Sequence, residues 1–168
     1  MTETGLSIAV VDDEESVRVA LRRLCVAYGI DAETFASVEQ LFDSLEGRRF
    51  DCLVLDAHMP GYGGLDAQTW LHESGIRIPA VIITGRDDDE MRIRSREVGA
   101  TACLCKPIDA EILFGAIRLA VRNSPNHGPI RWSEGLKRPW ESPGAEPPAT
   151  DAPNAVRERH YRPVPGFP

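Results

Sequence analysis

Five polar residues, each ending or following a short apolar run, together suit phosphoryl-transfer chemistry. In chain order they supply two adjacent carboxylates, a third carboxylate, a hydroxyl and an amine. Carboxylate oxygens bind hard cations such as Mg²⁺, one carboxylate can act as a nucleophile, and an ammonium group can pair with a phosphate. The five residues are Asp12, Asp13, Asp56, Thr84 and Lys106.

Three carboxylates in one crevice would repel one another, because two unit charges 4 Å apart interact by about 4 kcal/mol at an effective dielectric near 20. A divalent cation and Lys106 would offset that repulsion. One carboxylate can then take a phosphoryl group as an aspartyl phosphate in a roughly in-line transfer. The Thr84 hydroxyl can donate a hydrogen bond to the new phosphoryl oxygens.

The apolar runs are predicted strands that alternate with amphipathic segments. Strands are expected at residues 6–11, 32–35, 52–55, 80–83 and 102–105, and helices at 17–28, 38–45, 65–74, 88–98 and 113–120. Ser37 and Gln40 form a predicted capping box, and Gly29 a predicted helix end. Such alternation predicts a doubly wound α/β fold with a parallel sheet. Ligands bind at the carboxyl ends of such strands, where the five polar residues fall.

Four motifs together resemble the receiver domain of two-component response regulators. They are VVDDE at 10–14, DAHMPGYGGL at 56–65, IITG at 82–85, and GA at 99–100 leading to KP at 106–107. The resemblance covers about residues 6–122. It implies a flavodoxin-like fold, with five parallel strands in the order 2-1-3-4-5 and five flanking helices.

The resemblance also implies a task for each polar residue. Asp56 would be the phospho-acceptor, and Mg²⁺ would be bound by Asp13, Asp56 and the backbone carbonyl of His58. Asp12 would act on the metal mainly through bound water. Thr84 would be the switch hydroxyl. Lys106 would bind the phosphoryl group and be followed by a cis peptide to proline.

One residue near the site departs from the family pattern, and two others lie at positions that can bear on the phosphoryl lifetime. Receivers commonly carry an aromatic residue three positions before the lysine, where this chain has Cys103. We expect the usual aromatic readout of Thr84 to be absent or replaced. His58 and Arg86, two positions past Asp56 and Thr84, can donate hydrogen bonds and either tune the phosphoryl lifetime or are solvated loop residues.

Composition limits the function classes. The net charge is −7, and the acidic residues are concentrated before residue 123, which disfavours nucleic acid as a partner. Four cysteines without CxxC spacing predict buried free thiols of a reducing compartment. No apolar stretch is long enough to span a membrane. The sequence therefore predicts a soluble, cytoplasmic protein without a membrane partner.

The composition changes after Arg122. Ten of the thirteen prolines lie in residues 123–168, and no helical or strand period continues there. We expect a receiver domain at 1–122 and a mostly disordered tail at 123–168. The tryptophans Trp132 and Trp140 either fold back on the domain, are solvated, or form a docking motif for a partner.

The leading hypothesis is a stand-alone receiver that is phosphorylated on Asp56 by a histidine kinase or a phosphotransfer protein and is not itself an enzyme. It would signal to a downstream protein, or to a second copy of itself, through the face formed by the fourth helix, fifth strand and fifth helix. A truncated or atypical DNA-binding transcription regulator is the alternative. Two further hypotheses remain. One is a small phosphatase with an aspartyl nucleophile, and the other is a receiver that is never phosphorylated.

Overall fold

The computed structural model describes residues 5–86, 88–124, 129–130 and 138–141 and shows strands and helices in strict alternation. The strands are β1 (Ser7–Val11), β2 (Asp31–Phe35), β3 (Cys52–Asp56), β4 (Ala80–Thr84) and β5 (Ala102–Cys105). The helices are α1 (Glu15–Ala27), α2 (Val38–Leu45), α3 (Gly64–Glu73), α4 (Asp89–Glu97) and α5 (Ala110–Arg122), with a 3₁₀ turn η1 (Pro139–Glu141). All neighbouring strands are parallel, in the order β2-β1-β3-β4-β5, which confirms the predicted topology.

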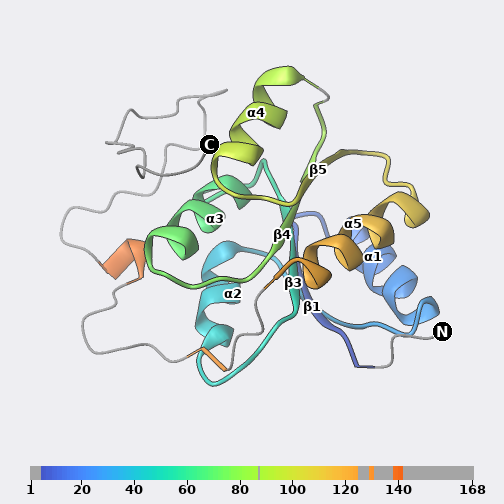
Figure 1. Cartoon of the computed structure of the whole chain (residues 1–168), viewed down its shortest axis with the longest axis horizontal. Coiled ribbons are helices and arrows are strands. Elements are labelled where there is room, and N and C mark those ends of the chain that lie inside the picture. The colour runs from blue at the N-terminus through green and yellow to red at the C-terminus, as the bar shows by residue number, and fades with distance from the viewer. Residues whose placement is uncertain (1–4, 87, 125–128, 131–137, 142–168) are drawn as a thin grey trace.

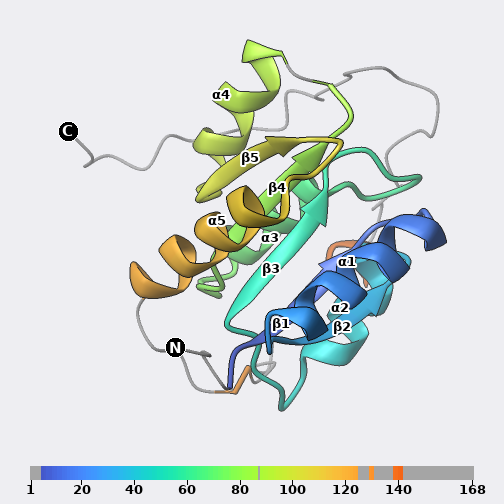
Figure 2. The ribbon, with the colours of Figure 1, turned by 90° about the vertical axis from the view of Figure 1, so that its right-hand side faces the viewer.

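Two apolar layers lie on opposite faces of this sheet. On one face, Leu41, Phe42 and Leu71 of α2 and α3 pack against alternate residues of the strands. On the other, Leu21 of α1 and Phe114 of α5 pack against the remaining alternate residues. Figure 1 shows α2, α3 and α4 to one side of the strands, and Figure 2 shows α1 and α5 in front of the sheet. Both faces are covered, so the central strands are buried throughout.

Side-chain caps begin three of the helices. Ser37 accepts a hydrogen bond from the Gln40 N–H at 3.2 Å, but the Gln40 side chain accepts from Ala36 rather than from Ser37, so the predicted capping box is only half formed. Asp88 caps α4 by accepting from the Met91 N–H at 2.7 Å. The Asp109 side chain accepts from the Ile112 N–H at 3.0 Å to begin α5.

The ion pairs of α4 differ in part from the sequence pattern. Spacing favours pairs of Asp88 with Arg92 and of Glu90 with Arg94. The second pair is present at 4.0 Å, but Arg92 lies 3.9 Å from Asp89 instead. Asp88 is the helix cap, where a carboxylate both satisfies a backbone N–H and faces the positive end of the helix dipole.

The four cysteines divide into two classes, although all were expected to be buried. Cys25 and Cys52 are buried, whereas Cys103 and Cys105 on the edge strand β5 are half-buried. A strand at the sheet edge has a neighbour on one side only, so its side chains are covered less completely. Burial raises the pKa of the Cys25 thiol to about 11 and that of Cys52 to about 12.

We expect this division to control thiol reactivity, because the thiolate is the reactive form. In native protein at pH 8, Ellman's reagent should react with Cys103 and Cys105, and with Cys25 and Cys52 only after denaturant is added. Mass mapping of the modified cysteines checks the assignment. Equal modification rates for Cys25 and Cys103 in folded protein would contradict it.

The Lys106–Pro107 peptide is cis, as predicted. Within the part of the chain that the structure describes, no helix is long and apolar enough to cross a membrane. Helix α5 ends at Arg122, and the predicted division into a domain at 1–122 and a tail at 123–168 stays a prediction. Most of the predicted tail, including Trp132, lies outside the described residues; Ile130 and Trp140 are inside them.

Candidate functional site

The adjacent acidic residues after β1 differ in exposure. Asp12 is buried and Asp13 is exposed. Asp12 Oδ1 accepts a hydrogen bond from the Glu14 N–H at 2.9 Å, and the Asp12 carbonyl accepts one from the Arg18 guanidinium at 2.8 Å. The turn into α1 therefore holds Asp12 in place.

Asp56 is the last residue of β3, and its side chain is buried. Its Oδ1 accepts a hydrogen bond from the His58 N–H at 3.1 Å. Strands β1 and β3 are neighbours in the sheet, so their carboxyl ends meet. One carboxylate oxygen from each of Asp12, Asp13 and Asp56 lies within 4.8 Å of the others. The fold thus brings together the three predicted acidic residues.

Lys106 supplies the counter-charge from the end of the edge strand β5. It follows β5, and its Nζ lies 2.9 Å from Asp12 Oδ2 and 3.4 Å from Asp56 Oδ2. The ammonium group donates a hydrogen bond to each carboxylate. One lysine against three carboxylates leaves a deficit of two positive charges if all three acids are ionised.

The pKa values of Asp56 and Lys106 reflect this crowding. Burial, with the nearby charge of Asp12, raises the pKa of Asp56 to about 6, although the His58 N–H and Lys106 act against the shift. Burial also disfavours the charged form of Lys106. Its hydrogen bond with Asp12 and the charges of Asp56 and Asp12 outweigh that effect, so the pKa of Lys106 is raised.

The oxygen donors fit a hard divalent cation. Mg²⁺ is commonly held by one or two carboxylates and keeps several waters. A charge of +2 equals the deficit left by Lys106. The donor set of Asp12, Asp13 and Asp56 contains no sulfur or nitrogen that would favour a softer metal. These residues therefore fit Mg²⁺.

Thr84 completes the set at the end of β4. It is buried, and its Oγ1 accepts a hydrogen bond from the Arg86 N–H at 3.1 Å. In the sheet register, Ile83 pairs with Asp56 and Thr84 pairs with Cys105. Thr84 therefore lies at the same edge as the carboxylates, on the strand between Asp56 and the segment that leads to Lys106.

Comparison with known proteins shows which family the chain belongs to. The sequence profile of the response regulator receiver domain matches residues 8–118. The chain belongs to the receiver domain family of response regulators.

Two curated relatives are similar over most of the chain. The response regulator protein TodT of Pseudomonas putida (strain F1) is 35% identical over 144 residues, which are 84% of this chain and 63% of TodT. The response regulator MprA of Mycobacterium sp. (strain KMS) is 35% identical over 123 residues, which are 73% of this chain and 54% of MprA. The chain thus spans somewhat more than half the length of these relatives.

Solved receiver structures share the fold. The response regulator StyR is 35% identical with a TM-score of 0.64, and the match covers 69% of this chain and 59% of StyR. The structure titled FixJ-N is 28% identical with a TM-score of 0.67, and the match covers 71% of this chain and 96% of that chain. Receiver domains of this family typically bind Mg²⁺ at acidic residues, and this receiver presents such an acidic cluster.

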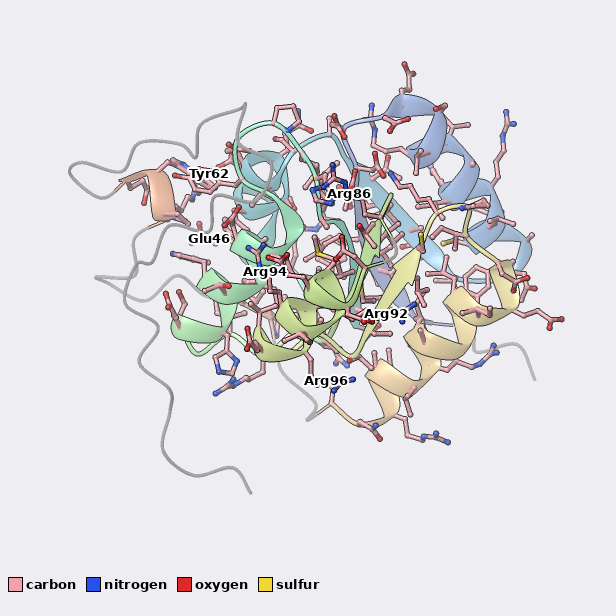
Figure 3. The ribbon with its side chains drawn as sticks, turned by 90° about the horizontal axis from the view of Figure 1, so that it is seen from above. Glu46, Tyr62, Arg86, Arg92, Arg94 and Arg96 are labelled. Atoms are coloured by element: carbon pink, nitrogen blue, oxygen red, sulfur yellow. The ribbon has the colours of Figure 1, made fainter. Side chains whose placement is uncertain are left out.

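His58 and Arg86, the two residues that either tune the phosphoryl lifetime or are solvated, interact electrostatically in the receiver. Burial lowers the pKa of His58, and the positive charge of Arg86 lowers it further. Figure 3 shows Arg86 beside the strand ends. A neutral imidazole adds no charge to the site, whereas the Arg86 guanidinium adds a positive one. The two residues at these positions therefore differ in charge.

Cys103, the departure from the family pattern, is half-buried on the α3 side of β5. It pairs with Ile82 in the register and packs against the cluster that contains Leu55 and Ile82. A thiol-sized group there fills less volume than the aromatic residue of the family pattern. The expectation that the aromatic readout is absent or replaced stays a prediction.

Sequence reasoning missed two supports of the receiver site. Helical spacing turns Arg18 away from the apolar stripe of α1, yet its guanidinium binds the Asp12 carbonyl. Gly64 lies directly before the predicted helix at 65–74, yet it begins α3 in close contact with the backbone of Asp56. A glycine pair directly before a helix was the available signal for a close backbone approach.

Proposed function

We propose that the receiver takes a phosphoryl group onto Asp56 from a histidine kinase or a phosphotransfer protein, with Mg²⁺ held by Asp12, Asp13, Asp56 and the backbone carbonyl of His58. The observation that carries this proposal is the meeting of three carboxylates with one lysine at the carboxyl edge of a parallel sheet. That arrangement suits the storage of a phosphoryl group rather than a purely structural ion pair.

Asp56 would be the nucleophile. A carboxylate oxygen forms a bond to phosphorus, the bond from phosphorus to the donor breaks, and its electron pair leaves with the donor. A Mg²⁺ ion held by the acidic residues would supply positive charge to offset the charge on the phosphoryl oxygens. The Asp56 carboxylate is already oriented by the His58 N–H at one oxygen and by Lys106 at the other.

Lys106 and Thr84 would then hold the product. Phosphorylation adds about −1.5 to −2 charges to the crevice. Lys106 is within reach of Asp56 and can pair with the new charge. Thr84 Oγ1 accepts from the Arg86 N–H, which leaves its own hydrogen to donate to a phosphoryl oxygen if the side chain turns toward Asp56.

The phosphorylated receiver would signal by binding a protein, either a downstream partner or a second copy of the chain, through the face of α4, β5 and α5. It would take part in its own phosphorylation and dephosphorylation without acting on another substrate. The free thiols of all four cysteines support the reducing cytoplasm as its compartment. The chain spans only part of the length of the curated relatives, so the proposal does not extend to the activity of those whole proteins.

Intact mass spectrometry of the full chain with acetyl phosphate tests the proposal. With Mg²⁺, we expect the mass of one phosphoryl group to be added, and with excess chelator we expect none. Borohydride reduction converts an aspartyl phosphate to homoserine and releases the phosphate, so fragment mapping of the reduced protein should find homoserine at position 56. A group mapped to another residue would refute the assignment, and many turnovers on a generic phosphate ester would favour a phosphatase instead.

A further inference from the structure

Residues beyond α5 return to the receiver on its α2 side. Ile130 is 8% exposed and belongs to the apolar cluster around Phe42 and Leu45. Its carbonyl accepts a hydrogen bond from the Gly47 N–H at 2.7 Å, and its N–H donates to the Arg48 carbonyl at 3.0 Å. This short backbone pairing fixes the chain beside the end of α2.

Trp140, in η1, makes a second contact nearer the candidate site. Its ring stacks on Phe42 of α2 with centroids 5.5 Å apart and an interplanar angle of 19°. Tyr62 lies 5.7 Å away at 47°, and Figure 3 shows Tyr62 next to η1. Arg138 forms an ion pair with Asp43 of α2. Aromatic pairs of this kind stabilise a contact beyond the effect of the area they bury.

The contact with Tyr62 matters because of where Tyr62 lies. It belongs to the segment of residues 57–63 between β3 and α3, which directly follows Asp56. The same segment contributes the His58 N–H that binds Asp56 Oδ1. Trp140 therefore braces, from outside, the segment whose backbone contacts the acceptor carboxylate.

The similarity to TodT extends into this region. The match covers 84% of the chain, whereas residues 1–122 make up less than three quarters of it. Some residues after Arg122 must therefore be aligned with TodT. The C-terminal segment is thus in part shared with a relative and is not merely appended to the receiver.

We propose that residues 138–141 act as a clamp in cis, with docked Trp140 holding residues 57–63 in the geometry that binds Mg²⁺. This inference rests on the proposed function. If docking fixes the segment in advance, Mg²⁺ has less conformational freedom to remove when it binds. By reciprocity, Mg²⁺ must then strengthen the docking of Trp140 by the same factor.

Calorimetric titration of the full chain with Mg²⁺ tests one side of this linkage. Trp140→Ala should raise the Kd for Mg²⁺ about fivefold or more, the lower end of common coupling factors. Trp140→Phe is the matched control, since it keeps an aromatic ring against Phe42 and Tyr62, and its Kd should stay within about twofold of wild type on the same scale. Circular dichroism establishes that each variant is folded.

Hydrogen exchange tests the other side. In wild type, Mg²⁺ should slow exchange in the peptide that contains residues 138–141 as well as in the peptide of residues 57–63. An unchanged Kd in Trp140→Ala, or unchanged exchange at 138–141, overturns the clamp.

The two proposals fail in different ways. Wild type that binds Mg²⁺ and is labelled on Asp56, together with an unaffected Trp140→Ala variant, would overturn the clamp alone. Wild type that binds no Mg²⁺ would overturn both the clamp and the proposed metal site.

Discussion

Asp56→Asn is expected to abolish labelling by acetyl phosphate and Mg²⁺ while leaving the protein folded. An amide lacks the anionic oxygen that attacks phosphorus, and Lys106 would retain Asp12 as its partner at 2.9 Å. Intact mass spectrometry should show no added phosphoryl group. Asp31→Asn is the matched control: Asp31 is exposed at the start of β2, and this variant should be labelled like wild type.

Asp56→Asn should also stabilise the metal-free protein above about pH 6. The pKa of Asp56 is raised from 3.8 to about 6, so the unfolded chain ionises this group more readily than the folded one. The resulting destabilisation is absent below about pH 4, grows between pH 4 and 6, and reaches about 2–3 kcal/mol above that range. Burying an amide offsets part of the gain, so we expect Asp56→Asn to raise the free energy of unfolding by about 1–2 kcal/mol.

Urea unfolding in chelator at pH 4 and pH 7 measures this effect. The difference between Asp56→Asn and wild type should be larger at pH 7. A variant that lost both labelling and stability would show that Asp56 supports the fold, and its loss of labelling would then say nothing of the nucleophile.

Gly64→Ala is expected to destabilise the receiver more than an ordinary surface substitution does. A Cβ at Gly64 would lie 2.6 Å from the Asp56 carbonyl oxygen and 2.8 Å from Leu55 Cβ. The first contact is with backbone at the end of a buried strand, which cannot move aside cheaply. The start of α3 would have to withdraw from β3 and displace residues 57–63. We expect a loss of about 3 kcal/mol of stability, at the upper end of the usual cost of overpacking.

Gly115→Ala is the matched control for Gly64→Ala. Gly115 lies inside α5, and a Cβ there meets nothing within 4 Å. Alanine is favoured over glycine in a helix interior by about 1 kcal/mol, so this variant should be equally or more stable than wild type. Urea unfolding and the Mg²⁺ titration should separate the two variants. Equal stability of Gly64→Ala and wild type would show that the close approach of α3 to β3 is not required.

The sequence predicted the sheet and the acidic cluster for the same physical reason. The three central strands are short apolar runs that are buried on both faces, and the polar residue that ends each run marks the carboxyl edge. Asp12, Asp56 and Thr84 could therefore be placed at one edge before any contact was known. The distances that join them to Lys106 could not, because they depend on how the strands are ordered and twisted.

Other features depended on contacts between distant segments. Nothing in the local sequence showed that Trp140 would pack on Phe42 and Tyr62, because solvation and folding back were both compatible with a proline-rich segment. Spacing alone likewise could not decide whether Asp88 would pair with Arg92 or cap α4. The exposure of Cys103 followed from the position of β5 at the edge of the sheet, which is a property of the whole topology.

The ion pair of Lys106 with Asp12 joins residues 94 positions apart, from the last strand to the first. A chain emerging from the ribosome displays Asp12, Asp13 and Asp56 well before Lys106 is made. Domains generally fold as units, and contacts of long sequence separation form late. During synthesis the three carboxylates would thus lack their lysine until β5 joined the sheet. A partly made domain would have the nucleophile but not the counter-charge, so the site becomes complete only when the fold does.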